Sequence, residues 1–339
     1  MKPEVLYGFF EWRKTLTFIM LKIISLILLI NLLIVGNCKS ESFTIDTNYE
    51  NTDTVKIITD NLFTGGINLV GVSSSDPKPI EVLYPFGKAN LQPVWKMPQW
   101  ASRFNLQGVK PEMKNDSVIY KNEGKKVSFL LKNGEAIVNM EVYASKEYLA
   151  PRKEGESWPH LLLEQKTNPI KLVNLKKLTY SIGAKLNYVL NKMGEDYNPG
   201  LHTCHITVYL LIQNTNNQST GHGDYFWFGL PLYDYRYRDL EEYGAQDLGK
   251  EDATKKYILN VASKTLFSGS LHDKQWIFIN KDIYPQLLAA FNQAKEKGYL
   301  KTSSISDMSI ESTNLGWEVP GTFDCSIQFK GLKLTGTTK

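Results

Sequence analysis

Short runs rich in Val, Ile, Tyr and Phe, separated by Gly, Asn, Asp and Lys, recur along most of this sequence. Runs of this length and composition form strands, and many of them at close spacing build a sandwich or a barrel. The predicted strands cover residues 54–59, 126–131, 136–143, 177–182, 205–213, 225–232, 274–279 and 323–334. Asn133 and Gly134 predict a tight hairpin between two of them, since both residues accept a positive φ. The expected fold class is all-β.

Residues 282–297 break this pattern. Four apolar residues recur there at helical spacing: Ile283, Leu287, Phe291 and Ala294. Asp282 can cap the start of a helix and Gly298 follows its end. Since strands flank this segment on both sides, we predict one amphipathic helix packed on the outside of the sheets.

The N-terminal region carries an apolar run at residues 22–35, which begins with Lys22 and is followed by small and polar residues. This order of parts is typical of a signal peptide. The run is also shorter than the roughly 20 apolar residues that a membrane span needs. Residues 1–38 are therefore predicted to be a signal peptide, and the protein to be exported, either secreted or periplasmic or held at the cell surface.

Met20 stands directly before the apolar run, and translation from Met20 would put Cys38 where a bacterial lipoprotein signal is cut. In that case Cys38 carries a lipid anchor to a membrane. The alternative is ordinary cleavage near Ser40, with Cys38 discarded.

Without the leader about 300 residues remain, enough for one large β domain. We expect residues 41–125 to form an irregular N-terminal β-rich segment that wraps the sandwich, and residues 126–336 to form the main domain. Five prolines interrupt the first of these segments: Pro77, Pro79, Pro85, Pro93 and Pro98. Cys204 and Cys325 lie in strand-like runs, so they form either one disulfide or two buried thiols.

The net charge is +4, with no block of basic residues interleaved with aromatics, so no nucleic-acid partner is expected. Aromatic residues make up 12% of the chain and crowd into a few strands. Such rings suit the faces of sugars, so the expected partner is a polysaccharide or oligosaccharide. His202 and His205 lack further ligands at zinc-site spacing, and we expect neither a metal nor another cofactor.

The first candidate site is the hexapeptide of residues 316–321, where Glu318 stands beside Trp317 between two glycines. A Glu held against apolar walls loses solvation of its charged form, which raises its pKa and suits it to act as a general acid. The alternative is a plain turn with a solvated Glu.

The second candidate site is the aromatic stretch of residues 221–238. A period of two residues puts Phe226 and Asp234 on one face of a strand. Trp227 lies on the other face, together with Tyr233, Tyr235 and Tyr237. Beyond Pro231, five residues could form a rim that binds ligand: Tyr233, Asp234, Tyr235, Arg236 and Tyr237. In the equally weighted alternative, Asp234 and Arg236 only form pairs with neighbouring residues, and the tyrosines belong to the core.

In residues 158–165, His160 and Glu164 share a face if the segment is extended. They could orient each other for acid–base work, or form a satisfied structural pair. In residues 95–100, Trp95 and Trp100 could stack on sugars or cover the core.

From about residue 205 to 334 the order of these parts resembles the family 12 glycoside hydrolases, which are endoglucanases with a concanavalin-like β-jelly roll. The matching parts are the strand and Asn-rich turn at 206–217, Gly223-Asp224-Tyr225, Trp276-Ile277-Phe278, the helix at 282–297, and Gly316-x-Glu318-x-x-Gly321. The resemblance implies a jelly-roll sandwich and covers less than half of the chain.

The resemblance also implies that Glu318 is the acid/base glutamate. The place of the family's nucleophile, directly after the Tyr of Gly-Asp-Tyr, is taken by Phe226, and its supporting Asp falls near Val208 or Tyr209. Because a glycosidase needs a second carboxyl, Asp234 or Glu164 could supply it. The predicted function is cleavage of extracellular polysaccharide, with Glu318 and Asp234 as catalytic residues and Tyr233, Tyr235, Arg236, Trp317, His160, Glu164 and Trp227 as substrate-binding residues. The alternatives are a glycan-binding jelly roll, a polysaccharide lyase, and a structural or adhesion protein of the cell surface.

Overall fold

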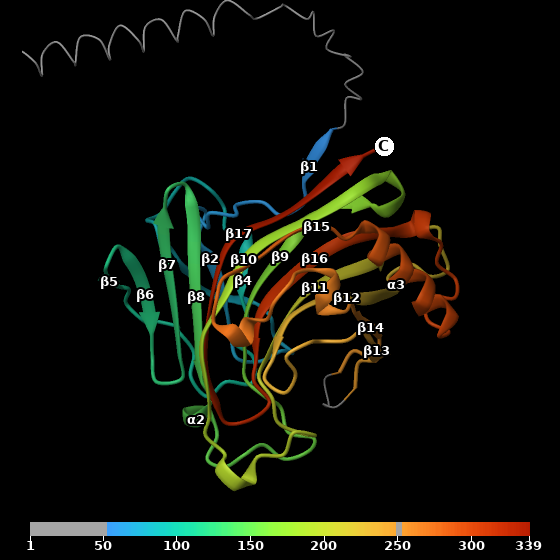
Figure 1. The fold of residues 1–339 in the computed structure, drawn as a ribbon. Helices are drawn as coiled ribbons and strands as arrows, with labels where there is room; N and C mark the ends of the chain where they lie inside the picture. Colours follow the sequence, from blue (N-terminus) through green and yellow to red (C-terminus); the bar gives the residue numbers. More distant parts are fainter. Residues whose placement is uncertain (1–52, 249–252) are drawn as a thin grey trace, which may run out of the picture. The chain divides into compact units, whose positions relative to one another are not determined.

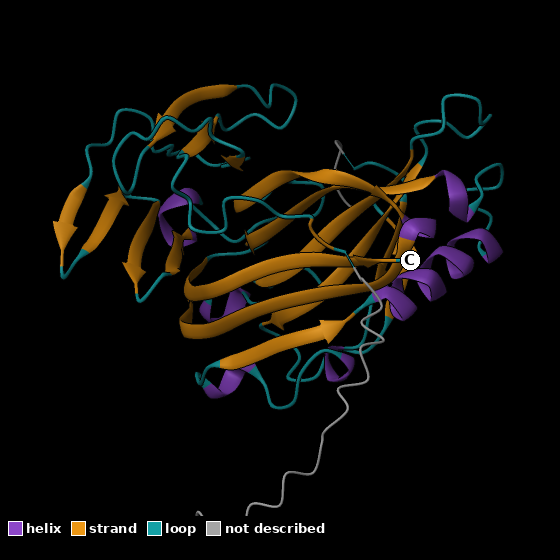
Figure 2. Cartoon of the chain, turned by 90° about the horizontal axis from the view of Figure 1, so that it is seen from above, coloured by secondary structure: helices purple, strands orange, loops and turns teal. Residues whose placement is uncertain are grey.

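The computed structural model describes residues 53–248 and 253–339, in which two β-sheets face each other (Figures 1 and 2). The predicted signal segment, Met20 and Cys38 lie outside the described residues. The all-β sandwich predicted from the sequence is thereby confirmed.

The first sheet runs in the order β15 (Ile277–Asp282), β10 (Leu175–Asn191), β17 (Phe323–Thr338), β8 (Glu135–Tyr143), β7 (Lys125–Lys132), β6 (Ser117–Lys121) and β5 (Glu112–Lys114), with β1 (Thr54–Lys56) also paired to β17. The second sheet runs in the order β13 (Tyr243–Gln246), β14 (Tyr257–Asn260), β12 (Tyr225–Asp234), β11 (His205–Asn214), β16 (Met308–Glu318), β9 (His160–Lys171), β4 (Trp95–Met97), β2 (Ile67–Val70) and β3 (Pro79–Leu83). From β8 to β11, and again from β14 to β17, the chain passes from one sheet to the other between successive strands. This alternation is what joins the sheets into one sandwich.

The predicted hairpin is present between β7 and β8, where Asn133 and Gly134 have φ values of 52° and 73°. The predicted helix is present as α3 (Tyr284–Glu296), which contacts β10 in the first sheet and β12 and β14 in the second. It therefore closes one edge of the sandwich from outside. The remaining helical segments are short: α2 (Ala144–Glu147), η1 (Leu172–Asn174), η2 (Gly194–Asp196), η3 (Ser263–Thr265), η4 (Leu271–Asp273) and η5 (Ile305–Asp307).

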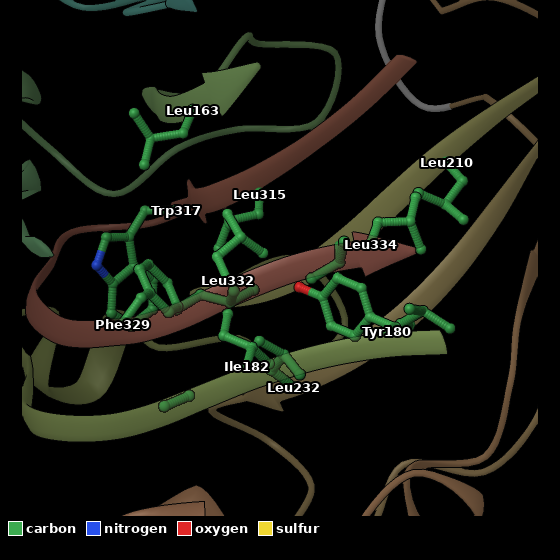
Figure 3. Packing of buried hydrophobic residues seen from close by; sticks show 14 of the residues in the cluster. Leu163, Tyr180, Ile182, Leu210, Leu232, Leu315, Trp317, Phe329, Leu332 and Leu334 are labelled. Atoms are coloured by element: carbon green, nitrogen blue, oxygen red, sulfur yellow. The ribbon is translucent and has the colours of Figure 1, made fainter. Parts of the chain in front are cut away.

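The core fills the space between the sheets (Figure 3). In β11 every second residue is fully buried, and the residues between them face outward. Trp317 of β16 lies in this core with no exposed surface, and its indole N–H donates to the carbonyl of Met140 in the opposite sheet at 3.0 Å. Figure 3 shows its ring close to that of Phe329.

Residues 53–121 contribute strands to both sheets. The β2, β3 and β4 strands extend the second sheet beyond β9, and β5 and β6 extend the first beyond β7. The boundary at residue 126 stays a prediction. Within the described residues no helix is long and apolar enough to cross a membrane.

A bulge in β12 changes which side chains face outward. Thr207 of β11 pairs with Pro231, and the residue before it, Ile206, pairs with Tyr233. Leu232 therefore has no partner in β11 and is the extra residue of the bulge. The plain period-two prediction is therefore wrong beyond Pro231. Tyr233 turns into the core, where it is 3% exposed, and Asp234 turns to the outer face.

Cys204 and Cys325 are both buried free thiols, which is the second of the two alternatives left open by the sequence. Burial and the neighbouring Cys325 thiol raise the pKa of Cys204. Both groups therefore belong to the core.

Candidate functional site

Four polar side chains form a row across the outer face of the second sheet. His160 on β9 pairs with Glu318 on β16, Glu318 pairs with His205 on β11, and His205 pairs with Asp234 on β12. Directly opposed residues in antiparallel strands project to the same face. Their neighbours in sequence on the first three strands point into the core: Leu161, Trp317 and Ile206.

The carboxylate of Glu318 is the centre of this row. Its Oε2 atom lies 3.2 Å from Nε2 of His160 and 3.8 Å from Nε2 of His205. The indole N–H of Trp158 donates to the same oxygen at 3.1 Å. Three nitrogen atoms thus converge on one carboxylate oxygen whose side chain is 22% exposed.

The tautomer of His160 follows from its other nitrogen. Nδ1 lies 2.8 Å from the carbonyl oxygen of Trp158, which only accepts hydrogen bonds, so Nδ1 carries a proton. In a neutral ring Nε2 then has a lone pair, which cannot bond to a bare carboxylate. The 3.2 Å contact between Nε2 of His160 and Oε2 of Glu318 is therefore an ion pair when the ring carries a second proton, at Nε2.

Aromatic rings hold His160 in place. The Trp158 ring stacks on it at 5.9 Å between centroids and an interplanar angle of 20°, and the Trp100 ring meets it edge-on at 5.7 Å. Trp158 belongs to the loop that precedes β9, and the guanidinium of Arg152 lies 4.8 Å from the centroid of its ring. Trp95, by contrast, is fully buried in the core. The imidazole facing Glu318 is thus packed from two sides.

A cavity of about 560 Å³ opens beside His205 on the same face. Its floor and walls come from β11, β12, β14 and the segment that leads into β13, and they are formed by His205, Thr207, Tyr209, Pro231, Tyr233, Asp234, Arg236, Tyr237, Asp239, Leu240, Glu241, Glu242, Tyr243 and Asn260. Burial raises the pKa of Tyr209, and the charge of Glu318 raises it further. Tyr209 therefore keeps its proton as a hydrogen-bond donor at neutral pH.

Asp234 lies in the cavity wall with its carboxylate already engaged. Arg236 donates from Nε to Oδ1 at 2.9 Å and from Nη2 to Oδ2 at 2.8 Å, and the Thr203 hydroxyl donates to Oδ1 at 2.8 Å. Burial by itself would raise the pKa of Asp234, but the Arg236 hydrogen bonds and the nearby His205 outweigh it and lower the pKa. Asp234 is thus an ionised carboxylate held by two parallel hydrogen bonds from the Arg236 guanidinium.

Glu164 lies on the same face, four residues along β9 from His160 and opposite Asn314. Four residues of strand correspond to about 13 Å. Burial raises the pKa of Glu164, against the charges of Lys96 and Lys166, and Lys96 Nζ lies 3.9 Å from its carboxylate. The structure therefore puts Glu164 on the correct face, away from Glu318.

Other residues singled out in the sequence lie elsewhere. Trp317 and Tyr233 lie in the core, with ring centroids 6.1 Å apart, and Tyr235 packs on Phe323 at 4.8 Å. Trp227 faces outward between two tyrosine rings, those of Tyr209 and Tyr225, at 6.0 and 5.8 Å. Phe226 is fully buried in the core.

His205 is the residue that the sequence analysis missed as a possible acid–base group. It was weighed only as a metal ligand, and the described residues contain no group of three or more His, Cys, Asp or Glu suited to a metal ion. Its Nδ1 atom is buried and has no hydrogen-bond partner in the structure. Only the pairing of β11 with β16 shows that it faces Glu318.

The sequence matches no protein-family model and no curated protein. Among solved structures, the chain is similar to a thermostable cellulase derived from the Cel12A cellulase of Rhodothermus marinus, with 10% identity, 67% of this chain and 95% of that chain covered, and a TM-score of 0.36. The family 12 xyloglucanase from Bacillus licheniformis gives 10% identity over 68% and 97% of the two chains with a TM-score of 0.38. The family 11 xylanase from Neocallimastix patriciarum gives 10% identity over 70% and 98% with a TM-score of 0.36.

Proposed function

We propose that this protein binds a polysaccharide along the outer face of the second sheet and hydrolyses a glycosidic bond at Glu318. The observation that supports this proposal is the convergence of His160, His205 and Trp158 on Oε2 of Glu318 beside an open cavity. A carboxyl group can act as a general acid once it is protonated, and His160 is placed to supply that proton.

In the proposed reaction Glu318 takes a proton from His160 and gives it to the glycosidic oxygen as the bond from that oxygen to the anomeric carbon breaks. A water molecule attacks the anomeric carbon from the opposite side and passes a proton to Asp234, which lines the cavity. The proton then returns to His160 from Asp234 through His205, which lies between Asp234 and Glu318 in the row, or through solvent. His160 and His205 act here as proton relays.

The separation of the carboxyl groups favours this scheme over a covalent one. Glu318 and Asp234 stand two strands apart with His205 between them, which puts their Cα atoms about 10 Å apart. A covalent glycosyl intermediate needs carboxyl groups about 5 to 5.5 Å apart, whereas attack by water fits about 6.5 to 9.5 Å. Asp234 is therefore the candidate for the base, and Arg236 and Thr203 hold its carboxylate in place.

The rings of the cavity suit sugar binding. Tyr237 and Tyr243 are 54% and 61% exposed at its margin, and Tyr209 lies on its floor. Exposed aromatic faces stack on the apolar faces of pyranose rings, while the polar groups between them accept and donate hydrogen bonds. These tyrosines would orient the chain across the Glu318 row.

A second candidate function is glycan binding without cleavage. Phe226, which takes the place where the resemblance calls for a nucleophile, is fully buried in the core. Binding would then use the same cavity and rings, and Glu318 would serve only as a hydrogen-bonding group.

Export is part of this proposal, since a polysaccharide substrate lies outside the cell. The apolar run at residues 22–35 supports a signal peptide, and Cys38 supports a lipid anchor. Alkylation and mass spectrometry of the protein recovered from the producing cells would show whether residues 1–38 are removed and whether Cys38 carries lipid.

The test is a panel of neutral and acidic polysaccharides, assayed for new reducing ends and for the absorbance of unsaturated sugars. We expect new reducing ends without unsaturated sugars, and a loss of at least a hundredfold in Glu318→Gln. Glu311→Gln is the matched control, since it makes the same change on the same strand. Unsaturated products would show that the protein is a lyase and not a hydrolase. Retained binding without any product would leave the binding function, and a Glu318→Gln variant with full activity would exclude this site.

A further inference from the structure

The outer face of the first sheet carries an aromatic pair that belongs to neither the core nor the Glu318 row. The rings of Trp276 and Phe278 lie 6.2 Å apart between centroids at an interplanar angle of 21°. Phe278 is 63% exposed, although it lies on β15, a strand of regular structure. Two nearly parallel rings, an exposed one on β15 and a half-buried one directly before it, form a stacking surface.

A glycine places this pair against the sheet. Gly183 on β10 pairs with Phe278 on one side and with Lys330 on the other. A Cβ atom at residue 183 would lie 3.0 Å from the Phe278 ring and 3.0 Å from the Lys330 side chain. The Nζ atom of Lys330 lies 5.0 and 5.2 Å from the two ring centroids. Any larger residue would push the ring outward, so the glycine keeps the surface low and flat.

A polar trough continues from the aromatic pair across the same face. Lys185 pairs with Gln328, Gln328 with Asn139, and Asn139 with Ser128, from β10 to β7. A cavity of about 320 Å³ lies over this row and is lined by Lys114, Asn115, Ser117, Ile119, Lys126, Ser128, Asn139, Glu141, Asn187 and Gln328. Amides, hydroxyls and lysines make up nearly all of this lining.

The amides in the trough are held in fixed orientations. Asn187 donates to Oδ1 of Asn139 at 2.7 Å, and Asn139 donates to Glu141 at 2.8 Å. Glu141 also pairs with Lys126 at 2.6 Å. Burial opposes ionisation of Glu141, but Lys126 and the surrounding donors lower its pKa, so the network stays charged and ordered. A preorganised set of donors and acceptors costs less entropy on binding.

We propose that this aromatic–amide face, defined by Trp276, Phe278, Lys330 and the trough around Asn139, is a second, non-catalytic binding site for an extended glycan chain. Sugar rings stack on the aromatic pair, and their hydroxyls bond to the amides of the trough. From β15 to β6 the face spans five strand spacings, about 24 Å, which is the length of several sugar units. Lys185 and Lys114 add positive charge, which also accommodates carboxylate groups on the chain.

This site lies on a different sheet from Glu318. The proposal of a second binding site can therefore be tested independently of the proposed hydrolysis. The test is affinity gel electrophoresis in the Glu318→Gln background, with hydroxyethyl cellulose as the neutral polysaccharide and polygalacturonate as the acidic one. We expect at least one of them to retard migration, and the pair Trp276→Ala and Phe278→Ala to lower the association constant about tenfold. The exposed loop residue Leu149 supplies the control Leu149→Ala, which should bind as the parent does.

Gln328→Ala tests the trough without touching the rings, and its expected effect is also weaker retardation. Thermal unfolding of every variant separates loss of binding from loss of fold. The proposal is overturned if neither polysaccharide retards the parent, or if the ring and Gln328 variants bind as the parent does. Ring-dependent sedimentation with phosphatidylglycerol vesicles, without retardation by either glycan, would instead identify a membrane surface as the partner.

Discussion

Trp158 contacts both His160 and Glu318: its indole N–H donates to Glu318 at 3.1 Å, and its carbonyl accepts from His160 at 2.8 Å. Its ring also stacks on the imidazole. One residue thereby fixes the carboxylate, the tautomer of the histidine and the plane of its ring.

Trp158→Phe should lower kcat about tenfold and should also lower the thermal midpoint. The substitution removes a hydrogen bond to a charged group, worth about 1.5 to 3 kcal/mol, while a ring still stacks on His160. The measurement is kcat and KM on the polysaccharide that the panel identifies, together with the thermal midpoint. A variant with unchanged kcat would show that the indole N–H has no part in the reaction.

Asp234→Asn should cost about 2 kcal/mol of unfolding free energy at neutral pH, because it weakens the hydrogen bonds from Arg236. The folded-state pKa of Asp234 lies below its ordinary value, so this stabilisation is present above the unfolded pKa near 4 and is lost as the pH falls. Urea unfolding of both proteins at pH 7 and pH 3 checks this, and we expect the difference to shrink at pH 3. We also expect kcat to fall at least a hundredfold, and an unchanged kcat would exclude Asp234 as the base.

Lys125→Met should change how stability depends on pH. The Lys125 side chain is 1% exposed beside Glu147 at 3.7 Å, and it also contacts Ser102 and the Phe104 carbonyl. Burial, opposed by Glu147, lowers the pKa of Lys125 to about 8. Since the unfolded pKa is about 10.4, the unfolded state binds more protons between these values, so this residue adds stability as the pH rises from about 8 to 10.4, by about 3 kcal/mol.

The measurement is the difference in unfolding free energy between wild type and Lys125→Met at pH 7, 8, 9 and 10. Other groups that titrate in this range cancel in the difference. A difference that stays constant across the series would contradict the lowered pKa.

Gly316→Ala should destabilise the protein by about 3 kcal/mol or more and displace Glu318, two residues along β16. Gly316 has a φ of 150°, and a Cβ atom there would lie 2.2 Å from the carbonyl oxygen of Leu161. Gly134→Ala is the matched control: its φ is 73°, but the space around it is open, so only about 1 kcal/mol is expected. Equal costs for the two changes would show that the contact with β9 relaxes.

The sequence predicted well those elements whose signals are local. The helical spacing of Leu287 and Phe291 gave α3, and Asn133-Gly134 gave the hairpin, because each depends on residues close along the chain. The β9 strand was missed because its inward-facing residues beyond Leu163 are polar: Gln165 and Thr167 are buried, so the alternation of apolar and polar residues stops there. Its place between β4 and β16 comes from pairing with distant segments.

The sequence by itself determined that the chain folds as β-sheets with one helix, and that Glu318 stands between two glycines before the last strand, since alternation, turn residues and glycines are local properties. That Glu318 ends a strand of its own, β16, was not predicted. Only the tertiary structure decided that His160 and His205 flank Glu318, that Trp317 supports it from the core, and that a bulge carries Asp234 outward. The physical reason is register: a one-residue shift between strands turns every side chain to the other face, and the pairing that sets it joins residues far apart in the chain.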